Sequence, residues 1–134
     1  KNIEHRIHKA IMPKLKELKL PYAFYDQEDI KNRKIYVELS RGCPFECEFC
    51  LSAIDEKVRG FNLDQLMNEF NILWQKGARE FKFIDRTFNL NIRIATRLLN
   101  FFLEKEDKCS LHFEVIPDHF PDNLKKIIQK FPKG

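Results

Sequence analysis

Ser40-Arg41-Gly42-Cys43-Pro44-Phe45-Glu46-Cys47-Glu48-Phe49-Cys50 is the stretch around which this chain is organised. Three of the four cysteines in the chain fall within eight positions of this stretch, with the spacing C-x3-C-x2-C. Thiolates this close in sequence can reach one metal centre together. Three thiolates are one fewer than a closed tetrahedral zinc site or an ordinary iron–sulfur cluster requires. The count therefore predicts a cluster whose last position is left for a ligand that is not protein.

Alternating apolar and polar residues predict three short strands, and helical patterns separate them. The strands are expected at 35–40, 80–85 and 111–115, and the helices at 62–76, about 91–104 and 121–130. Strands separated by helices imply parallel pairing with right-handed crossovers. The chain is therefore predicted to have an α/β fold.

The predicted strands also show which face of the sheet is covered. Their polar residues share a parity opposite to the apolar ones: Glu38, Ser40, Lys82, His112 and Glu114. We expect the apolar set to lie under the helices and the polar set to face a wet lumen. The alternative is an open sheet with one face in water.

The first 33 residues are predicted to form a helical leader or linker, and residues 34–134 the β/α part. Ile3, Ile7, Ala10 and Ile11 have helical spacing, which predicts a helix over residues 1–20. Pro13 should end or kink it. Residues 21–34 are polar and turn-like.

Composition limits the function classes. The 134 residues are one domain's worth of chain, and 43% hydrophobic with 33% charged residues is typical of a soluble globular protein. No segment is long and apolar enough for a membrane span. A formal charge of +4 does not indicate a nucleic-acid partner. Clustered cysteines with one distant cysteine favour a reducing compartment, so a cytoplasmic location is expected.

The cysteine spacing, with Phe49 directly before the last cysteine, resembles the radical S-adenosylmethionine (SAM) family. Residues 37–44 and the run Asp85-Arg86-Thr87-Phe88-Asn89 resemble the subgroup with an upstream cobalamin-binding domain. The resemblance implies that Cys43, Cys47 and Cys50 hold a 4Fe-4S cluster whose fourth iron is chelated by SAM. It also implies a TIM-like partial barrel, of which residues 34–134 supply the first three β/α units.

The resemblance assigns further residues to SAM binding. Phe49 is expected to wall the adenine, and its alternative role is packing within the loop. Relatives carry a Gly-Gly-Glu-like turn after the second strand, whereas residues 84–89 here contain no glycine. Asp85 would replace the glutamate as acceptor for the SAM ammonium, or else pair with Arg86 or cap the next helix. Glu114 is a candidate for a ribose or amino contact, or for an ion pair with Lys82.

The reaction implied is reductive cleavage of SAM to methionine and a deoxyadenosyl radical that abstracts hydrogen from a substrate. The electron would come from a reductant protein such as flavodoxin or ferredoxin. Cobalamin is a further expected cofactor of the full-length parent. The pattern does not identify the substrate.

Two other readings compete with this one. In the first, the chain is a zinc-binding structural module in which Cys109 or His112 completes the set of Cys43, Cys47 and Cys50. In the second, the open sheet edge after the third strand pairs with another copy of the chain, and the chain binds no cluster.

Overall fold

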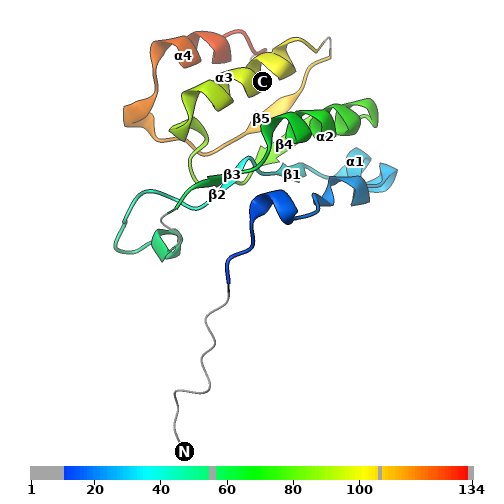
Figure 1. Ribbon diagram of the computed structural model, residues 1–134. Coiled ribbons are helices and arrows are strands. Elements are labelled where there is room, and N and C mark those ends of the chain that lie inside the picture. The colour runs from blue at the N-terminus through cyan, green and yellow to red at the C-terminus, as the bar shows by residue number, and fades with distance from the viewer. Residues whose placement is uncertain (1–10, 55–56, 106, 133–134) are drawn as a thin grey trace, which may run out of the picture.

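The structure is a computed structural model that describes residues 11–54, 57–105 and 107–132 (Figure 1). Its α-helices are α1 (Gln27–Asn32), α2 (Leu63–Gln75), α3 (Ile92–Leu103) and α4 (Asp122–Ile128). Its strands are β1 (Ile35–Val37), β2 (Ser40–Arg41), β3 (Arg59–Gly60), β4 (Glu80–Phe83) and β5 (Ser110–His112). Short 3-10 turns lie between them.

The main sheet has three parallel strands in the order β1-β4-β5. Ile35 lies opposite Phe81, and Lys82 lies opposite His112. Helices separate the strands along the chain, so each connection is a crossover of the β-α-β kind. The predicted α/β fold with a parallel sheet is confirmed. A separate antiparallel pair, β2 and β3, follows the end of β1.

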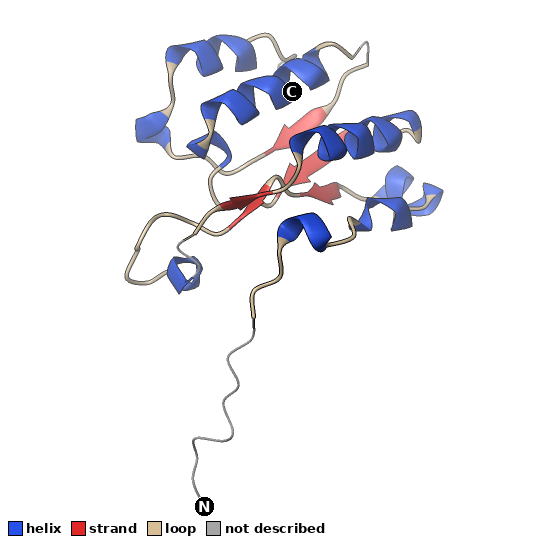
Figure 2. Cartoon of the chain, in the orientation of Figure 1, coloured by secondary structure: helices blue, strands red, loops and turns tan. Residues whose placement is uncertain are grey.

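Helices α2 and α3 cover one face of the sheet, as the arrangement in Figure 2 shows. Phe70 of α2 meets Phe83 of β4 edge-on, with ring centroids 6.0 Å apart. The ring centroid of Phe102 of α3 lies 4.9 Å from that of Phe81. These large rings are fully buried and account for much of the hydrophobic stabilisation. Helix α4 packs against α3 and buries Leu124.

The opposite face of the sheet is open among the described residues. Tyr36 is 50% exposed, His112 is exposed, and Lys82 is half-buried with its Nζ 5.4 Å from the Tyr36 ring centroid. Ile35 and Val37, of opposite parity, are buried. The predicted division into a covered apolar set and an open polar set is confirmed for these strands.

Local sequence signals explain where the helices begin and end. The Asn62 side chain accepts a hydrogen bond from the Gln65 N–H, which caps α2 with a residue type favoured at that position. Gly77, at φ 105°, turns the chain after α2 in the left-handed region that glycine tolerates. Pro121 precedes α4 as its N-cap residue, one position earlier than predicted.

The predicted leader helix can be compared with the structure only from residue 11 onward, because residues 1–10, with Ile3, Ile7 and Ala10, lie outside the described residues. Residues 11–20 contain a 3-10 turn, Leu15–Glu17, and no α-helix, and Lys14, which follows Pro13, is extended. This agrees with the expectation that Pro13 ends or kinks the helix, and the helix does not extend to residue 20. Conversely, the stretch predicted as turn-like contains α1. The residue that marks the start of α1 is Asp26, whose side chain accepts a hydrogen bond from the Asp29 N–H in a capping box.

Two tyrosine hydroxyls close the outer edge of β1. The Tyr22 hydroxyl bonds the N–H of Glu38 at 3.1 Å and its carbonyl at 3.4 Å. The Tyr25 hydroxyl does the same for Tyr36, at 3.1 and 3.2 Å. Edge strands leave such backbone groups unpaired unless something covers them. Tyr22 is also buried against Phe70, so the segment around it packs on both β1 and α2.

Within the described ranges, no helix has both the length and the apolar character needed to cross a membrane.

Candidate functional site

The cysteine loop begins and ends at the carboxyl end of β1. Strands β2 and β3 form its stem, with Ser40 opposite Gly60, and the Phe61 N–H donates to the Leu39 carbonyl at 2.9 Å. Gly42 has φ 98°, a left-handed conformation that directs the chain away from the sheet. The loop then extends outward from the main body (Figure 1). Its position agrees with the rule that reactive groups of β/α folds gather at strand carboxyl ends.

The three predicted cluster ligands lie on this one loop. Cys43 is buried, whereas Cys47 and Cys50 are exposed, and all three are free of disulfides. A turn links the latter two, with the Cys50 N–H donating to the Cys47 carbonyl at 3.0 Å. Among the described residues, however, no three His, Cys, Asp or Glu side chains are arranged to hold one metal ion. The structure therefore places the ligands on one loop without bringing their sulfurs together.

The donor chemistry fits a cluster better than the loop conformation does. Three free thiols in eight positions are the ligand type that iron–sulfur clusters use. Phe49 is 94% exposed and Leu51 84% exposed, so these two large side chains contribute little packing to the loop. Metal binding commonly supplies the free energy that orders such a segment. Cluster binding would require the loop to rearrange.

Asp85 holds the first residues of the cysteine loop in place through hydrogen bonds. Its side chain is 3% exposed and accepts hydrogen bonds from the Leu39 N–H at 2.9 Å and the Ser40 hydroxyl at 2.7 Å. Asp85 follows β4, so these bonds tie the end of β4 to the first residues after β1. Each carboxylate oxygen keeps acceptor capacity beyond these bonds, but the burial of the side chain limits the access of an ammonium group.

Burial raises the pKa of the Asp85 carboxyl above its ordinary value, because desolvation disfavours the charged form. The hydrogen bonds from Ser40 and from the backbone of Leu39 act in the opposite direction and reduce this rise. The donors therefore offset part of the cost of burying the charge.

The other two predicted SAM contacts are exposed. Phe49 lies on the cysteine loop, and Glu114 follows β5. The Glu114 carbonyl accepts from the Phe88 N–H at 2.8 Å, which joins the segments after β4 and β5. Both residues thus lie beyond the carboxyl ends of strands, Phe49 on the cysteine loop after β1 and Glu114 after β5.

A pocket of about 340 Å³ adjoins the cysteine loop. Its lining comes from the ends of β1 and β4 and from both arms of the loop: Glu38, Ser40, Arg41, Gly42, Leu51, Ser52, Ile84 and Arg86. Arg41 pairs with Glu38, Nε to Oε2 at 3.0 Å, and this hydrogen bond is the main cause that raises the pKa of Arg41. Arg86 is exposed at the pocket. The pocket therefore offers two guanidinium groups and one carboxylate.

These charged groups were not recognised from the sequence. Glu38 and Arg41 stand three positions apart, a spacing that brings side chains together on a helix but carries no such meaning across a strand and a loop. Tyr22, which holds the Glu38 backbone, belongs to a stretch predicted as turn-like. No sequence signal linked it to β1.

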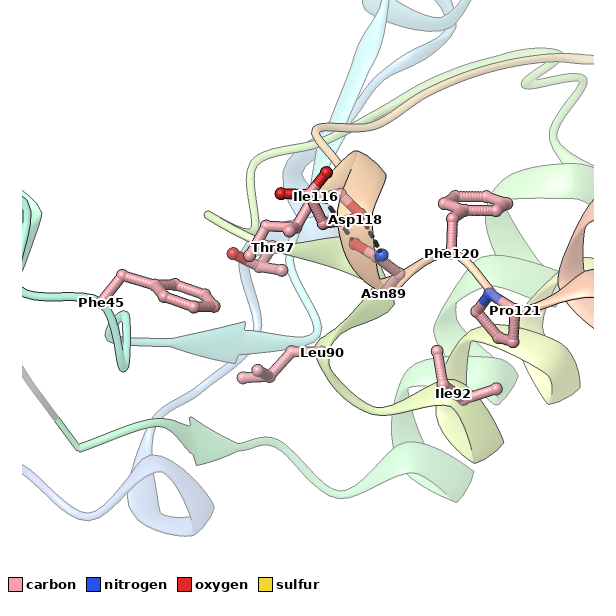
Figure 3. Close-up of a pocket in the computed structure, with 9 residues that line it drawn as sticks. All are labelled: Phe45, Thr87, Asn89, Leu90, Ile92, Ile116, Asp118, Phe120 and Pro121. Carbon is pink, nitrogen blue, oxygen red and sulfur yellow. Dashed lines mark hydrogen bonds between the residues drawn. The ribbon is translucent and has the colours of Figure 1, made fainter.

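A second pocket, of about 440 Å³, lies beyond the carboxyl ends of β4 and β5 (Figure 3). Its lining residues are Phe45, Thr87, Asn89, Leu90, Ile92, Ile116, Asp118, Phe120 and Pro121. The Asn89 side chain donates to the Ile116 carbonyl at 2.8 Å and accepts from its N–H at 2.9 Å. These two hydrogen bonds fix the segment after β4 relative to the segment after β5.

Of the two residues that could complete a zinc site, Cys109 lies at the opposite end of the sheet from the cysteine loop, whereas His112 is the last residue at the carboxyl end of β5. Cys109 directly precedes β5, at the amino end of the sheet, whereas the cysteine loop leaves the carboxyl end. Burial raises the pKa of the Cys109 thiol, and the nearby Arg79 charge reduces that rise. His112 lies at the far end of β5. Neither joins the loop cysteines in a metal-ligand group within the described chain.

Two transferases resemble this chain in sequence. An alignment of 58 residues with the uncharacterized methyltransferase PH0819 of Pyrococcus horikoshii shows 41% identity and covers 41% of the chain and 13% of that protein. An alignment of 108 residues with the ribosomal protein uS12 methylthiotransferase RimO of Chlamydia pneumoniae shows 27% identity and covers 73% of the chain and 23% of that protein. No protein-family model matches. The chain thus spans less than a quarter of each relative.

Proposed function

We propose that this chain is part of a radical SAM enzyme, in which Cys43, Cys47 and Cys50 hold a 4Fe-4S cluster. The observation that carries the proposal is the C-x3-C-x2-C loop at the carboxyl end of β1, next to a charged pocket. When bound, the reduced cluster would supply one electron to the SAM sulfonium, breaking a C–S bond to give methionine and a deoxyadenosyl radical.

The chain's own groups would hold and orient SAM. The pocket beside the loop matches the methionine portion, because guanidinium groups such as Arg86 bind carboxylates and Glu38 can accept from an ammonium. Phe49 would wall the adenine once the loop closes, and Glu114 would contact the ribose or the ammonium. Asp85 stays a candidate for the ammonium, provided that the group can reach its buried carboxylate.

The whole protein would transfer a methyl or methylthio group. Both relatives are named as transferases of this kind, a methyltransferase and a methylthiotransferase. The electron donor would be a flavodoxin or ferredoxin. Cobalamin in the full-length parent stays a prediction, since neither relative's name mentions it. A cytoplasmic location also stays a prediction.

Anaerobic reconstitution with iron and sulfide tests the cluster. We expect a brown protein with broad visible charge-transfer absorbance, and loss of that absorbance when Cys43, Cys47 and Cys50 are each replaced by Ala. Cys109→Ala is the matched control, because it removes a thiol that lies at the other end of the sheet. A colourless protein that binds zinc and loses it on the Cys109→Ala change would establish the zinc alternative instead.

The second measurement is SAM cleavage. The reconstituted chain is incubated with SAM and a chemical reductant, and methionine and deoxyadenosine are quantified. The expected result is both products in equal amounts, with none from the cysteine variants. An intact cluster that yields neither product would restrict the proposal to cluster binding.

A further inference from the structure

One side of the pocket of about 440 Å³, the larger of the two described above, is held in place by contacts within the protein. Asn89 is 2% exposed and forms its double hydrogen bond with Ile116 there. Just behind it, Phe88 stacks on Phe113 with centroids 4.3 Å apart and planes within 17°. These contacts join the segments after β4 and β5 without help from a ligand. The pocket is therefore preformed, as small-molecule sites usually are.

The lining of the pocket is chemically simple. Five of its residues carry large apolar side chains, namely Phe45, Leu90, Ile92, Ile116 and Phe120. Within the described part of the lining, Asp118 supplies the single charge, and Thr87 adds a hydroxyl. Sites for drug-sized molecules are about 300–1,000 Å³ and combine apolar walls with a few polar groups. The volume of about 440 Å³ and this lining fit that description.

We propose that this pocket binds a small molecule with an aromatic or aliphatic body and one cationic amine. The apolar walls would bury the body, and the Asp118 carboxylate would pair with the amine. Among the side chains that the structure describes, no other charged residue lines the pocket. The proposal does not rest on the function proposed above, because none of the lining residues is a predicted cluster ligand.

Phe45 connects this pocket to the cysteine loop. It lies between Cys43 and Cys47 and faces the residues of the opposite wall across the pocket (Figure 3). A ligand that packs against the Phe45 ring must therefore bias the conformation of the loop. In the proposed enzyme this would place a bound amine beside the loop that holds the cluster.

Two matched probes test the charge preference on the 134-residue chain. Tryptamine carries an indole and an ammonium, whereas indole-3-propionate carries the same ring and a carboxylate. Binding is measured by titration followed by two-dimensional NMR, which also locates the affected amides. Because Asp118 is exposed, we expect tryptamine to bind about twofold to fivefold more tightly, with the largest shifts at Phe45, Thr87 and Asp118.

Three variants complete the test. Asp118→Asn should abolish the preference for tryptamine with little change in affinity for indole-3-propionate, and Phe45→Ala should weaken both probes. Asp122→Asn is the control, because Asp122 is an exposed carboxylate on α4 that does not line the pocket. Equal affinity for the two probes, no binding of either, shifts confined to other residues, or an unchanged preference in Asp118→Asn would each overturn the proposal.

Discussion

The Ser40 hydroxyl donates a 2.7 Å hydrogen bond to Asp85 Oδ1, so the residue that opens the cysteine loop is held by the residue that follows β4. The second carboxylate oxygen of Asp85 accepts from the Leu39 N–H. Both donors belong to the short segment between β1 and the first cysteine. The conformation at the root of the loop thus depends on one buried carboxylate.

Asp85→Ala should destabilise the fold by about 2–3 kcal/mol, because it leaves a buried N–H and a hydroxyl without their acceptor. Urea unfolding followed by circular dichroism measures the change in the free energy of unfolding. Asp64→Asn is the control, since Asp64 is 79% exposed in its pair with Arg97 and should change stability by less than about 0.5 kcal/mol. Equal losses in the two variants would contradict the bracing role.

Asp85 should also give the stability a characteristic pH dependence. Its pKa in the folded chain is raised, so the folded state binds more protons than the unfolded state between the two pKa values. The stabilisation that the Asp85 carboxyl contributes is therefore fully present at pH values below its pKa in the unfolded chain. It is lost as the pH rises through its pKa in the folded chain. Asp85→Asn lacks this titration. Its unfolding free energy should accordingly improve relative to the parent chain as the pH rises from acidic to neutral.

The comparison that checks this is a pair of urea titrations, on the parent chain and on Asp85→Asn, at acidic and neutral pH. Titrations of the other groups cancel in the difference between the two proteins. A difference that moves in the opposite direction would show that the hydrogen bonds from Ser40 and Leu39 outweigh desolvation.

Tyr22→Phe should cost more stability than Tyr25→Phe. Each change removes one hydroxyl that bonds a backbone N–H and carbonyl on the outer edge of β1. Tyr22 is 2% exposed, so water replaces its hydroxyl poorly, whereas the Tyr25 bonds are exposed. We expect a loss of about 1–2 kcal/mol for Tyr22→Phe and less than about 1 kcal/mol for Tyr25→Phe. Urea unfolding ranks the two, and the reverse order would refute the explanation.

Most of the fold followed from periodicity. The three strands, the helices α2, α3 and α4, and the division of the sheet into covered and open faces were predicted because apolar spacing reports burial directly. The cap at Asn62 and the turn at Gly77 likewise follow from local residue chemistry. These features depend on residues that are close in sequence.

The remaining features depend on residues far apart in sequence. Asp85 accepts from a strand end 46 positions earlier, and Tyr22 reaches Glu38 across α1. No periodic pattern records such contacts. The strands are also shorter than predicted, since β5 ends at His112 and the segment beyond it turns away to join the residues after β4 through Glu114 and Phe88.

Asn89→Ala should loosen the larger pocket. It removes both hydrogen bonds to Ile116 and leaves that backbone N–H and carbonyl without these partners at a partly buried position. We expect a loss of about 2 kcal/mol in the free energy of unfolding and faster hydrogen exchange at the Ile116 amide. Asn100→Ala, on the exposed face of α3, is the matched control. An unchanged exchange rate at Ile116 would mean that other contacts hold the two segments together.

Pairing with a second copy of the chain, if it occurs, should take place at β5. The outer edge of β1 is closed by Tyr22 and Tyr25, whereas β5 is the last strand on the other side of the described sheet. An uncovered edge is a template for another strand. We expect light scattering after size-exclusion chromatography to give a dimer mass that falls toward the monomer on dilution. Hydrogen exchange should slow at Leu111 with increasing concentration and stay constant at Tyr36, and a monomer mass throughout would count against such pairing.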